Sequence, residues 1–242
     1  MKPVITTSWD DGHPLDLRVA AALARYGLRG TFYVPLVPVG KRVLDRTEMQ
    51  ELLDMGMEIG SHTVSHAVLT ELPDVEVDRE MGNSRRKLED LLGVAVTSFC
   101  YPKGRFSTRI TQRARLAGYR LCRTTVDFRT GIHFDPVRMP VSLHLFPHSS
   151  FAHYRHALRC RNWRGLWNWH GRFGGVTNVE RLASYMVDGI LERGGVFHLW
   201  GHSWEIEEQG LWPMFDRLAA MLGEVTEVSR LTNKDLLNAE PR

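Results

Sequence analysis

Short apolar runs and amphipathic segments alternate along almost the whole chain. Strands are expected over 4–8, 30–36, 57–61, 96–101, 120–125, 138–143, 196–200 and 224–228. Helices are expected between them, over 16–26, 48–55, 75–92, 108–116, 179–192 and 214–222, with a short last helix after Thr232. The alternation predicts a parallel sheet with crossover helices, either open or closed into a barrel.

Residues of the N-cap type precede three of these helices, namely Thr47, Ser107 and Asn178. One region departs from the alternation. Residues 144–176 carry Trp163, Trp167 and Trp169 among arginines, which indicates an ordered insertion or lid, since disordered segments contain few aromatic residues. No linker interrupts the chain, so residues 1–242 are expected to form a single domain.

Composition narrows the class of protein. A chain of 242 residues with 43% hydrophobic and 24% charged residues is typical of one globular domain. The net charge of +3 does not favour a nucleic-acid partner. Three widely spaced cysteines favour a reducing compartment over a disulfide framework. No signal-peptide pattern and no run of 18 apolar residues occurs, so a cytoplasmic protein without integral membrane association is expected.

Two carboxylates, Asp10 and Asp11, stand at the end of the first expected strand, directly before Gly12. Strand ends in α/β folds are where ligand sites form. Adjacent side chains at a strand end diverge, so one aspartate could hold a metal while the other handles a proton. The alternative is that Asp-Asp-Gly is only a turn.

Two histidines, His62 and His66, follow the third expected strand. At a spacing of four residues they would lie on one side of a helical turn, where both imidazoles can reach one ion. One carboxylate and two neutral imidazoles leave positions for water, as a catalytic divalent metal requires. Two solvent-facing loop histidines are the alternative.

Three motifs occur in a fixed order: Asp10-Asp11-Gly12, then His62-Thr63-x-x-His66, then Phe99-Cys100-Tyr101-Pro102-Lys103-Gly104. In this order they resemble the polysaccharide deacetylase family, which includes chitooligosaccharide and peptidoglycan N-deacetylases. The resemblance spans residues 4 to about 210. It implies a deformed (β/α) barrel of about seven parallel strands and metal-dependent hydrolysis of an amide bond.

The resemblance also implies residue roles. Asp11, His62 and His66 would bind a divalent metal, with zinc expected, and Asp10 would be the general base. The stretch Tyr101, Pro102, Lys103 and Gly104 would line the substrate groove, and an N–H near Lys103 would help to bind the oxyanion.

The leaving amine needs an acid, and the family uses a histidine after a late strand. His202 follows Gly201 at a strand end and is the preferred candidate. His198 lies in mid-strand, and we interpret it as a hydrogen-bonded core or groove-wall histidine. Glu205 would orient His202 or bind a substrate hydroxyl, with a plain surface position as the alternative. Trp200 is expected in the groove, since aromatic faces stack on sugar rings; a core position is the alternative for each tryptophan.

The chain departs from the family pattern near the third motif. The arginine that usually contacts the base aspartate is absent there, and Arg138 is the expected replacement, with a plain salt bridge as its alternative. The expected function is removal of an N-acetyl group from an N-acetylated sugar or glycan. A hydrolase of the same fold acting on a cyclic amide, or an inactive carbohydrate-binding relative, remain the alternatives.

Overall fold

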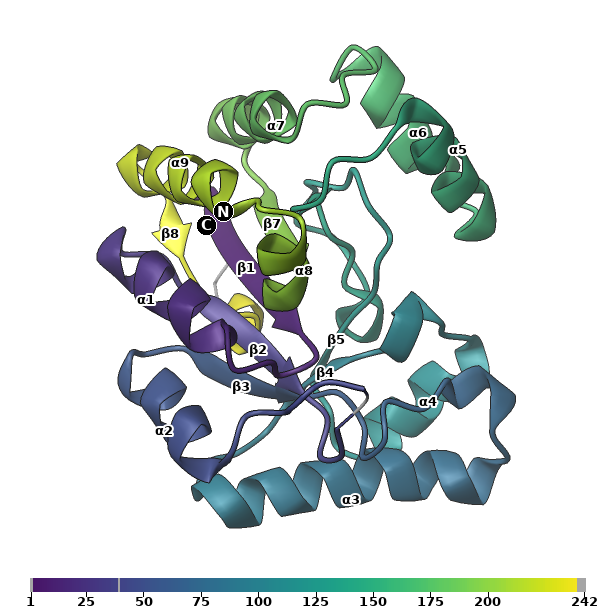
Figure 1. The fold of residues 1–242 in the computed structure, drawn as a ribbon. Coiled ribbons are helices and arrows are strands. Elements are labelled where there is room, and N and C mark those ends of the chain that lie inside the picture. The colour runs from purple at the N-terminus through teal and green to yellow at the C-terminus, as the bar shows by residue number, and fades with distance from the viewer. Residues whose placement is uncertain (1, 39, 239–242) are drawn as a thin grey trace.

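A curled parallel sheet forms the centre of the molecule in the computed structural model, which describes residues 2–38 and 40–238 (Figure 1). Its strands follow the order β5-β4-β3-β2-β1-β7-β6, and β8 pairs beside the start of β1. The strands are β1 (Val4–Asp10), β2 (Gly30–Val34), β3 (Glu58–Ser61), β4 (Ser98–Cys100), β5 (Leu121–Arg123), β6 (Leu143–His144), β7 (Val196–Gly201) and β8 (Ser229–Arg230). The deformed (β/α) barrel that the resemblance implies is confirmed.

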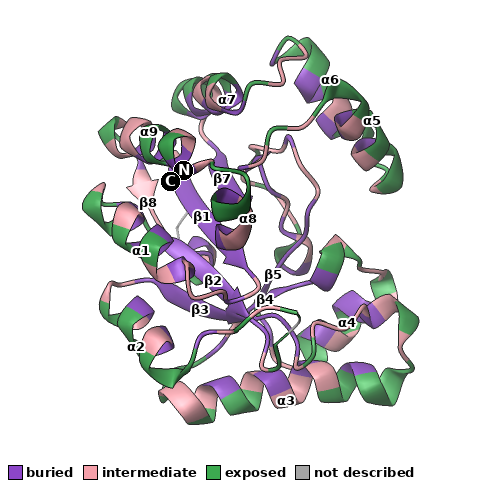
Figure 2. Ribbon diagram, viewed as in Figure 1, coloured by how far each residue is buried: buried purple, intermediate pink, exposed green. Residues whose placement is uncertain are grey.

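Helices surround the sheet, and most connect consecutive strands. They are α1 (Asp16–Arg25), α2 (Arg46–Asp54), α3 (Asp74–Leu92), α4 (Thr108–Leu116), α5 (Ser150–Arg159), α6 (Trp163–Gly171), α7 (Val179–Arg193), α8 (Ser203–Glu208) and α9 (Trp212–Glu224). Exposed residues lie mainly on the helices, whereas the central strands are buried (Figure 2). Among the residues that the structure describes, no helix combines the length and apolar character needed to cross a bilayer.

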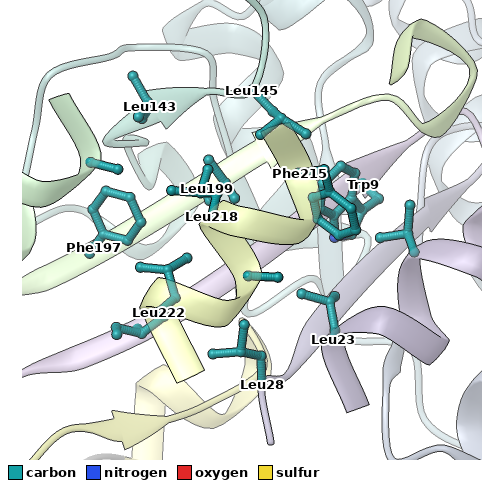
Figure 3. Close-up of a cluster of buried hydrophobic side chains, with 14 of the residues drawn as sticks. Trp9, Leu23, Leu28, Leu143, Leu145, Phe197, Leu199, Phe215, Leu218 and Leu222 are labelled. Carbon is teal, nitrogen blue, oxygen red and sulfur yellow. The ribbon is translucent and has the colours of Figure 1, made fainter. Parts of the chain in front are cut away.

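Strand β1 is buried along its whole length, and its alternation divides the core into two kinds of environment. Trp9 points toward the helices and meets Phe215 of α9 edge to face, with ring centroids 5.3 Å apart (Figure 3). The intervening residues make polar contacts instead: Thr6 Oγ1 bonds Asn233, and Ser8 Oγ bonds His198. Because side chains alternate along a strand, Asp10 shares the polar side with Thr6 and Ser8.

Several expected boundaries are wrong for identifiable reasons. The cap of α2 is Asp45 rather than Thr47, because Asp45 and Glu48 form a reciprocal capping box. The expected strand over 138–143 is instead a 3-10 turn, Pro136–Arg138, followed by irregular chain and the short β6. The last strand lies at Ser229–Arg230 rather than over 224–228. The caps at Ser107 and Asn178 are confirmed.

The tryptophan-rich insertion contains the helices α5 and α6. Trp169 is buried, stacks on Phe128 with ring centroids 5.9 Å apart, and donates its indole N–H to the Val176 carbonyl. Trp163 and Trp167 are 60% and 66% exposed and do not line the cavity described below. The insertion is therefore ordered, and its tryptophans divide between core and surface.

Candidate active site

The Asp-Asp-Gly stretch forms a sharp turn at the end of β1. Strand β1 ends at Asp10, and the next two residues have left-handed backbone, with φ of 76° at Asp11 and 58° at Gly12. A Cβ on Gly12 would lie 2.9 Å from Val34 Cγ1, so a larger residue does not fit this turn. The sharp turn leaves Asp10 pointing into the sheet interior and Asp11 at its edge.

The two histidines come together through a loop rather than the expected helical turn. Thr63 and His66 have positive φ values of 68° and 56°. Glu80 of α3 holds this loop, since its carboxylate accepts hydrogen bonds from the backbone N–H groups of Val64 and Ser65. The His62 and His66 rings then lie with centroids 4.7 Å apart.

Asp11, His62 and His66 form a group that fits a divalent metal. Their ligand atoms all lie within 4.8 Å of one another. Asp11 Oδ1 is 3.7 Å from His62 Nε2 and 3.4 Å from His66 Nε2. The other ring nitrogen of His62, Nδ1, is 2.8 Å from the Cys100 carbonyl, so Nδ1 carries the hydrogen and the Nε2 lone pair faces Asp11.

Two further effects suit this group to a metal. Burial lowers the pKa of His62 to about 4, which keeps the imidazole neutral as a ligand must be. Trp204 of α8 donates its indole N–H to Asp11 Oδ2 at 3.0 Å, which orients the carboxylate.

Asp10 is buried and paired with an arginine that the sequence analysis did not single out. Arg123, at the end of β5, donates to Asp10 Oδ1. Burial alone would raise the pKa of Asp10, but the Arg123 guanidinium and the nearby imidazoles hold it below its usual value. The prediction that Arg138 contacts Asp10 is wrong, because the Arg138 side chain is 40% exposed and donates to Thr108 and Thr111. The sequence did contain one signal for this role of Arg123, because a charged residue there ends an otherwise apolar strand.

His202 follows β7 and faces the same opening as Asp11. Its Nδ1–H donates to Glu205 Oε2 at 2.6 Å, and its Nε2 lies 4.0 Å from Asp11 Oδ2. Burial alone would lower the pKa of His202, but the bond to Glu205 and the charge of Asp10 raise it. His144 Nε2 lies 3.2 Å from the same Glu205 oxygen, and the His144 ring stacks on Trp200.

His198 lies in the interior, as its mid-strand position predicts. Its Nε2 is 2.8 Å from Ser8 Oγ, and burial lowers its pKa to about 3. It is therefore a neutral, hydrogen-bonded core histidine.

A cavity of about 670 Å³ connects these groups with the insertion. Its wall includes Asp10, Asp11, His62, His66, Lys103, Gly104, Asp127, His144, Trp200, His202 and Trp204, and it continues along α5. Tyr101 and Pro102 are buried and are not part of the wall, and the Tyr101 hydroxyl donates to the Val137 carbonyl. Of the third motif, only Lys103 and Gly104 reach the expected groove.

The family model described as polysaccharide deacetylase matches residues 1–122, half of the chain, and the match includes Asp10, Asp11, His62 and His66. The chain belongs to the polysaccharide deacetylase family. Arg123, Glu205 and His202 lie beyond the matched residues, so the family model does not bear on them.

Relatives within this family are distant. Chitin deacetylase 1 of Cryptococcus neoformans is 33% identical over 138 residues, which are 55% of this chain and 28% of that protein. A chitin deacetylase of Arthroderma benhamiae is 27% identical over 198 residues, 78% of this chain and 48% of that protein. The chain thus spans less than half the length of these curated relatives.

A solved structure supports the fold along the whole chain. The family 4 acetyl xylan esterase from Clostridium thermocellum, in complex with a cobalt ion, matches with a TM-score of 0.61 at 16% identity. The match covers 97% of this polysaccharide deacetylase family chain and 90% of the esterase chain.

Proposed function

We propose that this chain is a metal-dependent hydrolase that removes the N-acetyl group from an N-acetylated sugar or glycan. The main support for this proposal is that Asp11, His62 and His66 lie together in the wall of one cavity. Asp10 and His202 lie beside them in the same wall. A carbohydrate-binding relative without activity would not need a metal group, a buried ionised carboxylate and a paired histidine together.

Asp11, His62 and His66 would hold the ion. One carboxylate and two neutral imidazoles suit zinc, which is the metal we favour. When bound, such an ion polarises the acetyl carbonyl and lowers the pKa of water toward neutrality. The cobalt ion in the acetyl xylan esterase structure supports a divalent ion in this fold.

Asp10 would act as general base. Its pairing with Arg123 keeps the carboxylate ionised, so it can accept the proton of an attacking water. The tetrahedral oxyanion needs a backbone donor near it. In the turn after β4, the N–H groups of Gly104 and Arg105 already donate to the Tyr101 and Pro102 carbonyls, which makes the Lys103 N–H the candidate donor.

His202 would protonate the departing amine. Glu205 accepts from His202 Nδ1–H and so fixes the ring with Nε2 toward the opening. The bond to Glu205 and the charge of Asp10 raise the pKa of His202, which favours the protonated form that donates. Trp200 and Trp204 form part of the cavity wall and offer aromatic surface to a sugar ring.

The compartment of this reaction stays a prediction. All three cysteines are free thiols, which is compatible with the reducing compartment that the sequence predicts.

The test is release of acetate from N-acetylated chitooligosaccharides by the metal-loaded protein, with acetylated xylan and a cyclic imide as parallel substrates. Asp10→Asn should abolish acetate release and retain a stoichiometric metal, while the exposed matched control Asp188→Asn keeps full activity. Full activity in Asp10→Asn would refute the base assignment. If the protein hydrolyses the cyclic imide and neither acetylated substrate, the substrate is a cyclic amide or imide and not an N-acetylated sugar.

A further inference from the structure

One face of α5 forms the outer part of the active-site wall. Ala152, Arg155, His156 and Arg159 all line the cavity. Their spacing of i, i+3, i+4 and i+7 places them on a single stripe of the helix. The insertion therefore presents two arginines, one helical turn apart, to the cavity that contains the proposed catalytic groups.

Neither arginine forms an ion pair with a carboxylate among the residues that the structure describes. The Arg155 side chain makes no hydrogen bond or ion pair with any residue in the described ranges 2–38 and 40–238, and the Lys103 side chain on another part of the wall makes none either. Arg159 Nη2 lies 3.1 Å from His156 Nδ1. His156 Nε2 lies 2.7 Å from the Thr125 carbonyl, so Nε2 donates its hydrogen to that oxygen.

The stretch of sequence that contains α5 has no acidic residue. Between Asp135 and Glu180 the chain contains six arginines and no aspartate or glutamate. Asp127 also lines this end of the cavity. Its carboxylate accepts from Asn162 Nδ2 at 3.1 Å and faces His156 at 3.9 Å. Burial raises the pKa of Asp127, and the charges of His156 and Arg159 act against that rise. The net charge of +3 for the whole chain conceals this local excess of positive charge.

We propose that the α5 end of the cavity binds an acidic group, a phosphate or carboxylate, carried by the N-acetylated sugar. The proposal rests on the proposed function of the same cavity, since it places the acetamido group at Asp11, His62 and His66 and the acid at Arg155 and Arg159. Arginine suits this task because its planar guanidinium donates two parallel hydrogen bonds to a phosphate or carboxylate. The substrate class is thus narrowed to acidic N-acetylated sugars.

The test measures binding directly, by calorimetry, with three probes: N-acetylglucosamine, N-acetylglucosamine 1-phosphate and N-acetylmuramic acid. The metal-loaded wild type should bind one or both acidic probes at least about ten-fold more tightly than the neutral sugar, and the stronger of the two identifies phosphate or carboxylate. This preference should fall as salt rises from 0.05 to 0.5 M, since exposed charges are screened. The double variant Arg155→Gln/Arg159→Gln should lose the preference and still bind N-acetylglucosamine.

The matched control is Arg164→Gln/Arg172→Gln, which removes two exposed arginines of the same acid-free segment that do not line the cavity. It should retain the preference. Equal binding of neutral and acidic probes by the wild type would overturn the proposal. A preference for the acidic probes that survives in Arg155→Gln/Arg159→Gln would also overturn it, since the acid would then bind at the metal. So would a preference that the control loses equally, since the preference would then reflect only the general surface charge.

Kinetics separate this subsite from the proposed function. With an acidic substrate, Arg155→Gln/Arg159→Gln should raise KM about ten-fold and leave kcat nearly unchanged. An unchanged KM would overturn the subsite. Absence of acetate release from every probe, with the binding preference intact, would overturn the proposed deacetylation and leave the acidic subsite standing.

Discussion

Replacing Arg123 by methionine tests whether the buried pair with Asp10 organises the site. Arg123 is fully buried, and the Asp10 side chain is 6% exposed. Arg123→Met keeps much of the apolar volume but leaves the Asp10 carboxylate without its countercharge. Breaking a buried pair by removing one partner costs about 3–5 kcal/mol. A chain of this size changes its Tm by about 2–4 °C per kcal/mol, so a drop of roughly 6–20 °C is expected.

The matched variant separates loss of the pair from loss of packing. Asp10→Asn combined with Arg123→Met removes both charges, so the double variant should recover about 2 kcal/mol relative to the sum of the single variants. Arg138→Met is the control for removing an arginine, because Arg138 is half-exposed and its loss should cost less than about 1 kcal/mol.

The assay is urea denaturation at pH 7 with a chelator present, so that bound metal does not contribute to stability. The free energies of unfolding of wild type, both single variants and the double variant form a thermodynamic cycle. Additive changes within about 0.5 kcal/mol would refute the coupling of Arg123 to Asp10. A larger loss for Arg138→Met than for Arg123→Met would contradict the importance of the buried pair.

His66→Ala should reduce metal binding at least about ten-fold while the fold persists in circular dichroism, and full stoichiometric metal by elemental analysis would contradict its assignment as a ligand. His198 has a pKa of about 3 in the folded chain against 6.5 when unfolded, so protons bind the unfolded chain first as pH falls. Wild type should therefore lose about 2 kcal/mol more stability between pH 6.5 and 5 than His198→Gln does, and parallel pH profiles would contradict this. Gly104 has φ of 63° and a Cβ there would overlap the Thr125 side chain, so Gly104→Ala should lower stability by about 1–3 kcal/mol in urea titrations, against no change for Gly131→Ala, which has open space.

The residues of the proposed metal group were predictable because each follows a strand. Asp11 comes after β1 and His62 after β3, and in a parallel sheet the ends of the strands meet at one edge. His202, after β7, joins them by the same rule. Alternating apolar and amphipathic segments already predict a parallel sheet, so position along the chain was sufficient to bring these side chains together.

The partners of those residues could not be predicted in the same way. Arg123 is 113 residues from Asp10, and the pair depends on which side of β5 its side chain occupies. Arg138 failed as the candidate because its segment forms a 3-10 turn and irregular chain instead of the expected strand. Only the tertiary structure decides such contacts, since they depend on the register and curl of the sheet.

The cavity shows the same division between sequence and structure. Sequence alone identified 144–176 as ordered and aromatic, and it contained the acid-free run of arginines. It did not show that Arg155 and Arg159 line the cavity whereas Trp163 and Trp167 are exposed away from it. Local spacing determines which residues share a face of a helix, but which face meets the cavity is determined by how that helix packs on the rest of the chain.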